Sequence, residues 1–488
     1  MWRQLRRPAV VVFVAALLVR VLYVLSIRHA VFFEHLQTEP LHYDEWARAI
    51  LDGQAPVHLP FDEAPGYPYF VALIYALTGG SVLAACLVQA VLGAAACAAI
   101  ARIAGRLGGS LACGCAGAVA ALYGPFIYFT GQLEPATLAV VAIAAALLAT
   151  PTTEASPRRW LLAGAAWALA IVIRGEVAFA IPFVVLHAWR VESRRASLRV
   201  VIVPAALVVV SLGANLAASG HPVLLTTGSG VNLWIGNNPD ADGVDPFIHG
   251  SLVPVVAEVE ASSPDPVERD RAFRRHAQLS ASLLAKKLVW TFSRRELPNA
   301  ADISWQTSQS WVFQPPVFPI GFAILLPLAL AGMLAAGRRR DRIVLAGPVL
   351  AGLVACVVFF TNARFRLVMA PSLIALAGLA IESLVRGDRR RRILAAVGFA
   401  IGAVVAWPGY FGVAHYRIAE IDFNTGSLEH IAGHLDRASL YLRSGLARRP
   451  DDAAAWRELA SVLEQSGDHA GAQRAFDRLL DLPGNSKQ

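Results

Sequence analysis

Apolar runs of more than 18 residues constrain this chain more than any other feature. The first run, 8–28, contains VVVFVAALLVRVLYVLSI with one interior arginine. A helix of this length crosses the hydrocarbon core of a bilayer, about 30 Å thick, with its backbone groups bonded internally. Only 16% of the 488 residues are charged and 56% are hydrophobic, whereas soluble domains are about a quarter charged. The sequence therefore predicts an all-α polytopic membrane protein.

Basic clusters between the apolar runs predict the topology. Short cytoplasmic loops carry an excess of Lys and Arg, and PRRW, GRRRDR and RGDRRRR all fall on one side if the spans alternate. The N-terminus is then cytoplasmic, the first helix is retained rather than cleaved, and the C-terminus is periplasmic. Because the net charge of +8 resides in such clusters, no nucleic-acid partner is predicted. About eleven spans are expected: 8–28, 82–103, 111–130, 135–150, 160–173, 177–189, 200–218, 318–336, 344–361, 367–385 and 394–412.

Three segments outside the spans complete the predicted organisation. Two outer loops, 29–66 and 219–316, belong to a transmembrane domain over 1–412. The remaining segment, 413–488, is predicted to form soluble periplasmic helices whose AAWRELASVLEQSGDHAGAQRAFDRLLDLPG approaches the tetratricopeptide spacing. A generic amphipathic helical hairpin is the alternative. Two such repeats are few for an independent array, so we expect them to dock on the membrane domain or to bind a protein partner.

Charged residues gather on the predicted outer side. They are Asp44, Glu45, Glu134, Arg174, Glu176, Arg364 and Arg366, and Arg20 lies within the first span. A charge within a span costs about 2.5–3.5 kcal/mol on insertion scales, so such residues usually serve a site. Each residue also has a plainer interpretation: Asp44 as a helix cap near Glu45, Arg174 as the local partner of Glu176, Arg20 extending toward the headgroups, and the late arginines binding ordinary lipid phosphates.

Carboxylates and guanidinium groups together suit one kind of reaction at a membrane surface. A sugar carried on a lipid phosphate has a leaving group that is already an anion, so no general acid is needed. One carboxylate that takes the acceptor's proton and fixed cations that hold the departing phosphate are sufficient. The sequence thus favours transfer of a sugar from a lipid phosphate.

Several motifs resemble one family of enzymes. HYDEWARAILDG followed by APGYPYFVALIYALTG is similar to the first outer loop of glycosyltransferases of superfamily C, in particular the protein-mannosyltransferase-like family 39. NLWIGNNPDADG and RRELPNAADIS are similar to stretches of bacterial members with C-terminal tetratricopeptide repeats, and ARFRLVMAPSLIALAG is similar to the family's late outer turn. The chain lacks a repeat pattern for the β-trefoil domain that protein mannosyltransferases carry in a long outer loop.

The resemblance implies roles for individual residues. Asp44 would be the catalytic carboxylate, with Glu45 beside it. Glu134 would be the second acidic position, and Arg364 with Arg366 the late basic turn. Some superfamily members hold a divalent metal between acidic residues and the lipid phosphate, and Asp44 with Glu134 would be the ligands here. No other cofactor is implied. The GNNPDADG stretch would be either an ordinary surface loop or a wall of the substrate cavity.

These observations lead to a hypothesis of function with two rivals. The hypothesis is an inverting glycosyltransferase of the bacterial inner membrane. Its donor is a polyprenyl-phosphate monosaccharide that enters from the lipids of the outer leaflet, and its acceptor is a periplasmic glycan, lipid or protein. Asp44 would act as the base, and Glu45, Glu134, Arg174, Arg364 and Arg366 would bind substrate. The rivals are a transporter or flippase of lipid-linked or small solutes and a non-catalytic assembly factor.

Overall fold

The structure is a computed structural model that describes residues 2–54, 61–250, 252–298, 301–314, 319–336, 340–407 and 409–482. Within these ranges all regular elements are helices, and the single β-bridge joins Tyr123 to Ile320. The all-α prediction is therefore confirmed for the described chain.

Helices long and apolar enough to cross a bilayer are fewer than the eleven expected. Four segments meet that standard: Arg7–Ile27 in α1 (Trp2–Ile27), α5 (Val82–Gly108), α11 (Arg194–Ser219) and Arg342–Phe359. Four shorter apolar helices accompany them: α4 (Gly66–Thr78), α6 (Ser110–Leu122), α8 (Ala136–Ala149) and α17 (Phe322–Ala335). These helices support a multi-pass membrane protein, while the number of spans stays a prediction.

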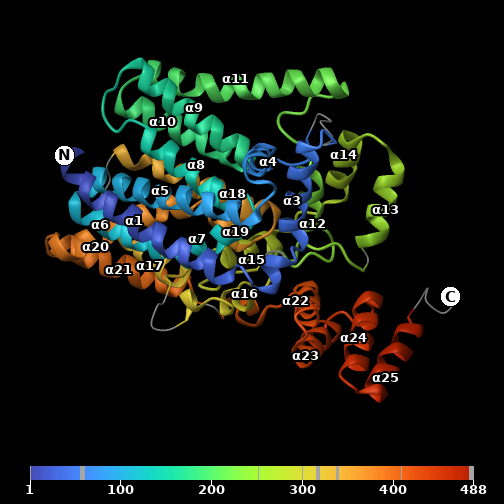
Figure 1. Ribbon diagram of the computed structural model, residues 1–488. Coiled ribbons are helices and arrows are strands. Elements are labelled where there is room, and N and C mark those ends of the chain that lie inside the picture. The colour runs from blue at the N-terminus through green and yellow to red at the C-terminus, as the bar shows by residue number, and fades with distance from the viewer. Residues whose placement is uncertain are drawn as a thin grey trace.

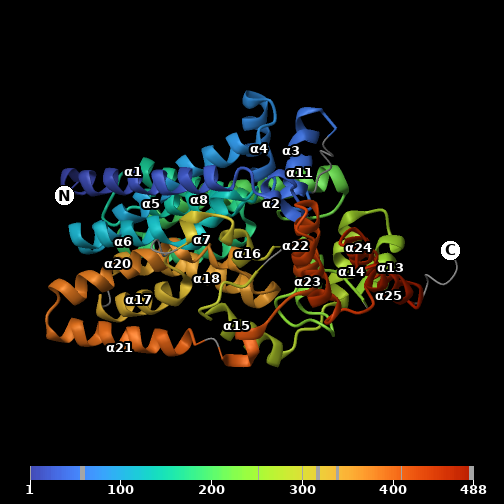
Figure 2. The ribbon, with the colours of Figure 1, turned by 60° about the horizontal axis from the view of Figure 1, so that its bottom comes forward.

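The apolar helices form one elongated bundle, with α1, α5, α6 and α8 packed beside α17, α20 (Ala370–Arg386) and α21 (Arg389–Val405) (Figures 1 and 2). Close approach of the helices depends on small residues, as is usual in membranes. A Cβ at Gly332 would overlap the carbonyl of Leu376, and one at Gly378 would lie 2.7 Å from the carbonyl oxygen of Ala112. The long helix α11 lies along one edge and packs on α9 (Pro157–Ile173) and α10 (Ile181–Val191) (Figure 1).

Arg20 lies inside this bundle and does not extend to the headgroups. Its side chain is fully buried and donates to the carbonyls of Ala120 (3.3 Å) and Ala121 (3.4 Å). These carbonyls belong to the last turn of α6, where Tyr123 adopts an extended conformation before α7 (Gly124–Tyr128). The last carbonyls of a helix lack partners in the helix itself, and a cation there is favourable. The span expected over 111–130 is therefore two helices, with the guanidinium at the break.

Most loop helices gather at the end of the bundle opposite the N-terminus, which we call the loop end (Figures 1 and 2). The helices of the loops are α2 (Val31–Glu34), α3 (Thr38–Leu51), α12 (Ser229–Gly236), α13 (Leu252–Ser262), α14 (Pro266–His276), α15 (Ala281–Thr291) and α16 (Ile303–Ser308). Two short elements bring inner segments to the same end: the 3₁₀ turn η2 (Gly175–Ala180) between α9 and α10, and α19 (Ala363–Arg366). The π-helical turn η5 (Ala355–Phe359) follows α18 (Ala346–Val354) and precedes α19.

The C-terminal segment forms four helices with their own core: α22 (Ala419–Ile431), α23 (Leu435–Leu446), α24 (Ala453–Gln465) and α25 (His469–Leu480). This segment contacts the loop end through α22. The buried Trp305 donates its indole N–H to Glu429 Oε1 at 2.7 Å, and Leu428 packs with Phe32. Contact with the rest of the chain agrees with the expected docking, while the tetratricopeptide assignment stays a prediction.

Candidate functional site

Helix α3 brings acidic residues to the loop end on two different faces. Glu39 and Tyr43 are four residues apart and therefore share one face, whereas Asp44 lies about 140° further around the helix axis than Glu39. The helix begins at Thr38, the one described non-glycine residue with a positive φ, at 52°. A β-branched residue seldom adopts this conformation, and such outliers concentrate at functional sites.

Arg364 joins Glu39 across 325 positions of sequence. Its Nη1 donates to Glu39 Oε2 at 2.5 Å and lies 3.8 Å from Glu134 Oε2. The short helix α19 that carries Arg364 is capped by Asn362, whose Oδ1 accepts from the backbone N–H of Phe365 at 2.8 Å. One guanidinium therefore lies between two carboxyl groups, and the three side chains come from segments far apart in the sequence.

Glu134 lies in the turn between η1 (Phe129–Gly131) and α8, and it is buried. The amide of Gln89 holds this turn, since it donates to the carbonyls of Thr130 (3.1 Å) and Gln132 (3.0 Å). Burial, and next the charge of Glu39, raise the pKa of Glu134 to about 8 despite the nearby arginines. The carboxyl group is thus poised to hold a proton near neutral pH.

Arg174 completes the group that we call the Arg364 cluster: Glu39, Tyr43, Glu134, Arg174 and Arg364. It pairs with Glu176, Nε to Oε1 at 2.7 Å, as the plainer interpretation had it. Its guanidinium also lies 5.0 Å from the centre of the Phe365 ring, and its charge lowers the pKa of Glu134. Arg174 therefore pairs with Glu176 and also contributes positive charge near Glu134.

Arg366 points away from this cluster. It is buried, donates to the carbonyls of Ser293 and Arg295 at 2.7 Å each, and pairs with Glu296 at 2.5 Å. The two late arginines are two residues apart on a helix and so do not share a face. Arg364 therefore lies near Glu134, whereas Arg366 binds residues 293–296 of the second loop.

Asp44 and Glu45 also lie apart from the contacts of Arg364. Asp44 accepts two hydrogen bonds from Arg48, at 2.8 and 3.0 Å, and one from Tyr75 at 2.5 Å. It is not a helix cap, because α3 begins six residues earlier at Thr38. Glu45 is exposed. Glu39 is the acidic residue of the first loop that reaches Arg364, and the sequence interpretation did not include it.

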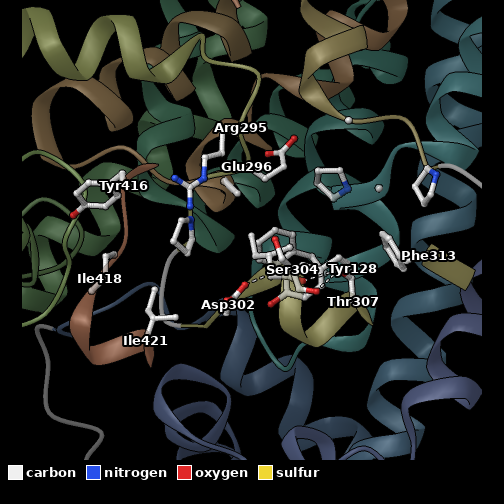
Figure 3. A pocket seen from close by; sticks show the side chains of 18 of the residues that line it. Tyr128, Arg295, Glu296, Asp302, Ser304, Thr307, Phe313, Tyr416, Ile418 and Ile421 are labelled. Carbon is white, nitrogen blue, oxygen red and sulfur yellow. Dashed lines mark hydrogen bonds between the residues drawn. The ribbon is translucent and has the colours of Figure 1, made fainter. Parts of the chain in front are cut away.

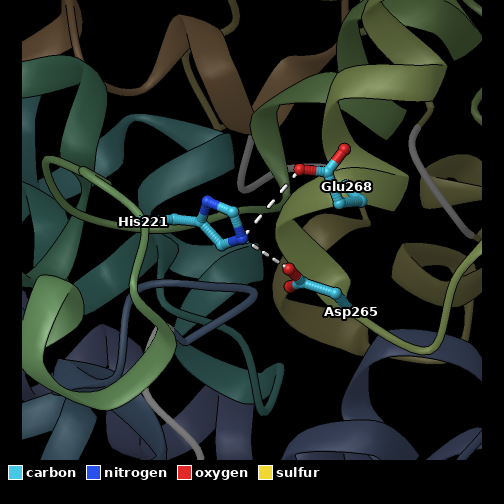
Figure 4. A group of neighbouring side chains, drawn as sticks. All are labelled: His221, Asp265 and Glu268. Carbon is cyan, nitrogen blue, oxygen red and sulfur yellow. Dashed lines mark ion pairs between the residues drawn. The ribbon is translucent and has the colours of Figure 1, made fainter.

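The metal ligands that the resemblance implied, Asp44 and Glu134, have other partners in this arrangement. Within the described residues, one group offers three metal-ligating side chains within 4.8 Å: His221, Asp265 and Glu268 (Figure 4). His221 Nε2 lies 2.7 Å from Asp265 Oδ2, and Glu268 Oε1 accepts from Arg271 at 2.6 Å. Because Arg271 and His221 already pair with these carboxylates, the contacts of this group are those of a partly exposed ion-pair network.

A cavity of about 390 Å³ is lined by Arg295 and Glu296, the partners of Arg366, and not by the residues of the Arg364 cluster (Figure 3). Its walls come from α7, from the second loop, and from the segment that leads into α22, and Ala363 just before Arg364 contributes to them. Polar and aromatic side chains line it together: Tyr128, Arg295, Glu296, Asp302, Ser304, Thr307, Phe313 and Tyr416. The mixture of hydroxyl, charged and aromatic groups suits a polar organic ligand.

The site therefore defines a class: polytopic helical membrane proteins with a buried carboxylate–arginine cluster at one end of the bundle. Residues 62–215 match the family described as dolichyl-phosphate-mannose-protein mannosyltransferase. This match includes Glu134, Arg174 and the APGYPYFVALIYALTG motif. It confirms, for this part of the chain, the resemblance to protein-mannosyltransferase-like membrane glycosyltransferases.

Comparisons over the whole chain are more distant. No curated protein matches the sequence. The structure of ArnT from Cupriavidus metallidurans bound to undecaprenyl phosphate is 16% identical, with a TM-score of 0.45, covering 96% of this chain and 75% of that one. AglB from Archaeoglobus fulgidus, in complex with an inhibitory peptide and a dolichol-phosphate, is 13% identical with a TM-score of 0.42, covering 82% of this chain and 55% of that one.

Proposed function

We propose that this protein is an inverting glycosyltransferase that moves a monosaccharide from a polyprenyl-phosphate donor to an acceptor hydroxyl. The observation that carries the proposal is the position of Arg364 between Glu39 and Glu134. The family matched by residues 62–215 is one of sugar transfer, which agrees with this chemistry.

Arg364 is the proposed contact for the donor's phosphate. Its Nη1 is occupied by carboxylates, but its buried Nε has no hydrogen-bond partner among the described residues. A buried donor without a partner is costly, and a phosphate oxygen would satisfy it with a charge-assisted bond. Arg174 would add to the positive field, since its charge already reaches Glu134.

Glu39 is the proposed base. In a single displacement, the acceptor oxygen attacks the anomeric carbon, the bond from that carbon to the phosphate oxygen breaks, and the phosphate leaves with the bonding electrons. The acceptor's proton passes to the carboxylate of Glu39, whose charge is held by Arg364. Attack opposite the leaving group inverts the anomeric configuration. Asp44 is the alternative base, although Arg48 and Tyr75 take up both of its oxygens.

The location and organisation that we propose are those that the apolar runs and basic clusters of the sequence predict. The protein would lie in the bacterial inner membrane with its N-terminus in the cytoplasm and the loop end in the periplasm. The donor would then enter from the outer leaflet, and the acceptor would occupy the cavity beside Ala363. Residues 1–412 would form the transferase domain, and residues 413–488 would be periplasmic helices that contact it through Trp305 and Glu429.

The test uses purified full-length protein with polyprenyl-phosphate sugars and a periplasmic extract as acceptor. We expect release of polyprenyl phosphate together with a new glycosidic bond. Arg364→Met should weaken the binding of undecaprenyl phosphate about tenfold to a hundredfold, because a charge-assisted hydrogen bond is lost. A wild-type protein that binds no polyprenyl phosphate would overturn the proposal.

Two further measurements separate the rival functions. In proteoliposomes, movement of the lipid-linked sugar across the bilayer without a new glycosidic bond would indicate a transporter. A chain ending after Gly412 that keeps donor turnover would exclude the assembly factor, because a scaffold without its helices has no remaining role.

A further inference from the structure

The GNNPDADG motif packs against the backbone that precedes the turn carrying Arg364. The side chain of Asn237, which follows the last residue of α12, is fully buried, and its Nδ2 donates to the carbonyl of Val358 at 2.7 Å. A Cβ at Gly236 would overlap the carbonyl of Phe359. Both residues therefore pack against the backbone at 358–359, and this part of the motif is buried rather than an ordinary surface loop.

A buried lysine joins the motif to the same backbone. Lys287 of α15 has almost no exposed surface, and its Nζ donates to Asn237 Oδ1 at 2.8 Å and to the carbonyl of Phe359 at 2.6 Å. Burial lowers the pKa of Lys287 to about 8, and the charge of Asp242 opposes that shift. Burying an ammonium group is costly unless acceptors surround it, so these two contacts maintain its position.

The local backbone explains why these donors are needed. Residues Ala355–Phe359 form a π-helical turn, and the helix stops at Phe360, which is extended with φ −147° and ψ 153°. The last carbonyls of a helix have no partners within it, and a cation near them is favourable. The Asn237 amide and the Lys287 ammonium satisfy the carbonyls of Val358 and Phe359 respectively.

The chain then reaches Arg364 within five residues. On the way, the N–H of Thr361 donates to the carbonyl of Gly243, which ends the same motif, at 2.8 Å. Thr361 Oγ1 also lies 3.3 Å from the carbonyl of Lys287. Hydrogen bonds from the motif and from α15 therefore hold the segment between the end of η5 and the start of α19.

We propose that Lys287 and Asn237 are positioning residues that hold the Arg364 turn in place for the donor's phosphate. The inference rests on the proposed function, because it assigns these residues to the same site. Neither residue contacts the Arg364 side chain in the described structure, so their effect passes through the backbone of 358–364.

The test is a double-mutant cycle on binding of undecaprenyl phosphate to the purified full chain. Lys287→Met keeps the length of the side chain and removes its donors, and it should weaken binding about tenfold. In an Arg364→Met background, the same change should weaken binding by no more than about twofold, because the group it positions is gone. The matched control is Lys286→Met, the neighbouring lysine over the Trp290 ring, which should bind as the wild type does.

The outcomes are separable from those of the proposed function. If the wild type binds undecaprenyl phosphate and Lys287→Met binds it equally well, the inference is overturned alone. The inference is also overturned if Lys287→Met weakens binding about tenfold in the Arg364→Met background as well. A residue that only stabilises the fold would behave in that way. If Lys287→Met does not fold, Asn237→Ala enters the same cycle with the same expected pattern. A wild type that does not bind overturns both proposals.

Discussion

Glu39 Oε2 and Arg364 Nη1 lie 2.5 Å apart although the residues are separated by 325 positions. One comes from the first turn of α3 and the other from α19, so this contact joins the first loop to the late part of the bundle. The second carboxylate, Glu134, lies 3.8 Å from the same nitrogen atom. Both proposals depend on this group of three side chains.

Asp44→Asn tests the carboxylate that the sequence favoured. Asparagine keeps an acceptor for Tyr75 and loses the ion pair with Arg48, whose side chain is half exposed. Because the Asp44 side chain is only 12% exposed, the lost bonds to its charge are worth about 1.5–3 kcal/mol, so we expect a lower melting temperature and transfer within about tenfold of wild type. Complete loss of transfer in Asp44→Asn, with an active Glu39→Gln protein, would give the base role to Asp44.

Glu134 should make stability depend on pH. Its pKa is raised from 4.5 to about 8 in the folded protein, so the folded state holds a proton that the unfolded state has released. The free energy of unfolding therefore loses this contribution as pH rises from about 4.5 to about 8. Melting temperatures at pH 5.5 and 8.5 should show a steeper fall for wild type than for Glu134→Gln. Parallel pH profiles for the two proteins would contradict the assignment.

Trp305→Phe tests the contact between the C-terminal helices and the loop end. The change removes the indole N–H that donates to the buried Glu429 carboxylate, a loss of about 1.5–3 kcal/mol for a bond to a charged group. Limited proteolysis should release the segment after residue 416 faster than in wild type, and donor turnover should stay unchanged. Trp311→Phe is the control, since that side chain is 54% exposed; equal proteolysis of both variants would be evidence against the contact.

Chelation of divalent metals tests whether Arg364 supplies the positive charge by itself. Because its guanidinium already lies between Glu39 and Glu134, transfer in excess EDTA should stay within about twofold of the untreated rate. Loss of transfer on chelation, restored by added Mg²⁺ or Mn²⁺, would show that the acidic residues hold a metal.

The sequence predicted the helical class, because long apolar runs leave a chain few alternatives to membrane helices, and it named three members of the Arg364 cluster: Glu134, Arg174 and Arg364. Glu134 and Arg364 were recognised as charges at the edges of such runs, and the structure brings them together. Glu39 was not considered, and the plainer interpretation of Asp44 as a cap placed the helix start near Glu45, whereas the helix starts at Thr38. That shift decides which carboxylate faces Arg364, since Asp44 lies about 140° around the axis from Glu39.

Long-range contacts account for the rest of the difference. Nothing in ARFR shows that Arg366 pairs with Glu296 while Arg364 pairs with Glu39, because that choice depends on where the second loop folds back. The role of GNNPDADG was likewise hidden, since its partners, Lys287 and the backbone at 358–359, are 50 and 121 residues from Asn237.

The single-turnover rate of Glu39→Gln tests the proposed base most directly. With bound polyprenyl-phosphate sugar and saturating acceptor, glutamine keeps the size of the side chain but cannot accept the proton. We expect a rate at least about a hundredfold below wild type, the contribution typical of a general base, with donor affinity changed by no more than about threefold. A Glu39→Gln protein that transfers sugar at the wild-type rate would contradict the assignment of Glu39 and, with it, the proposed mechanism.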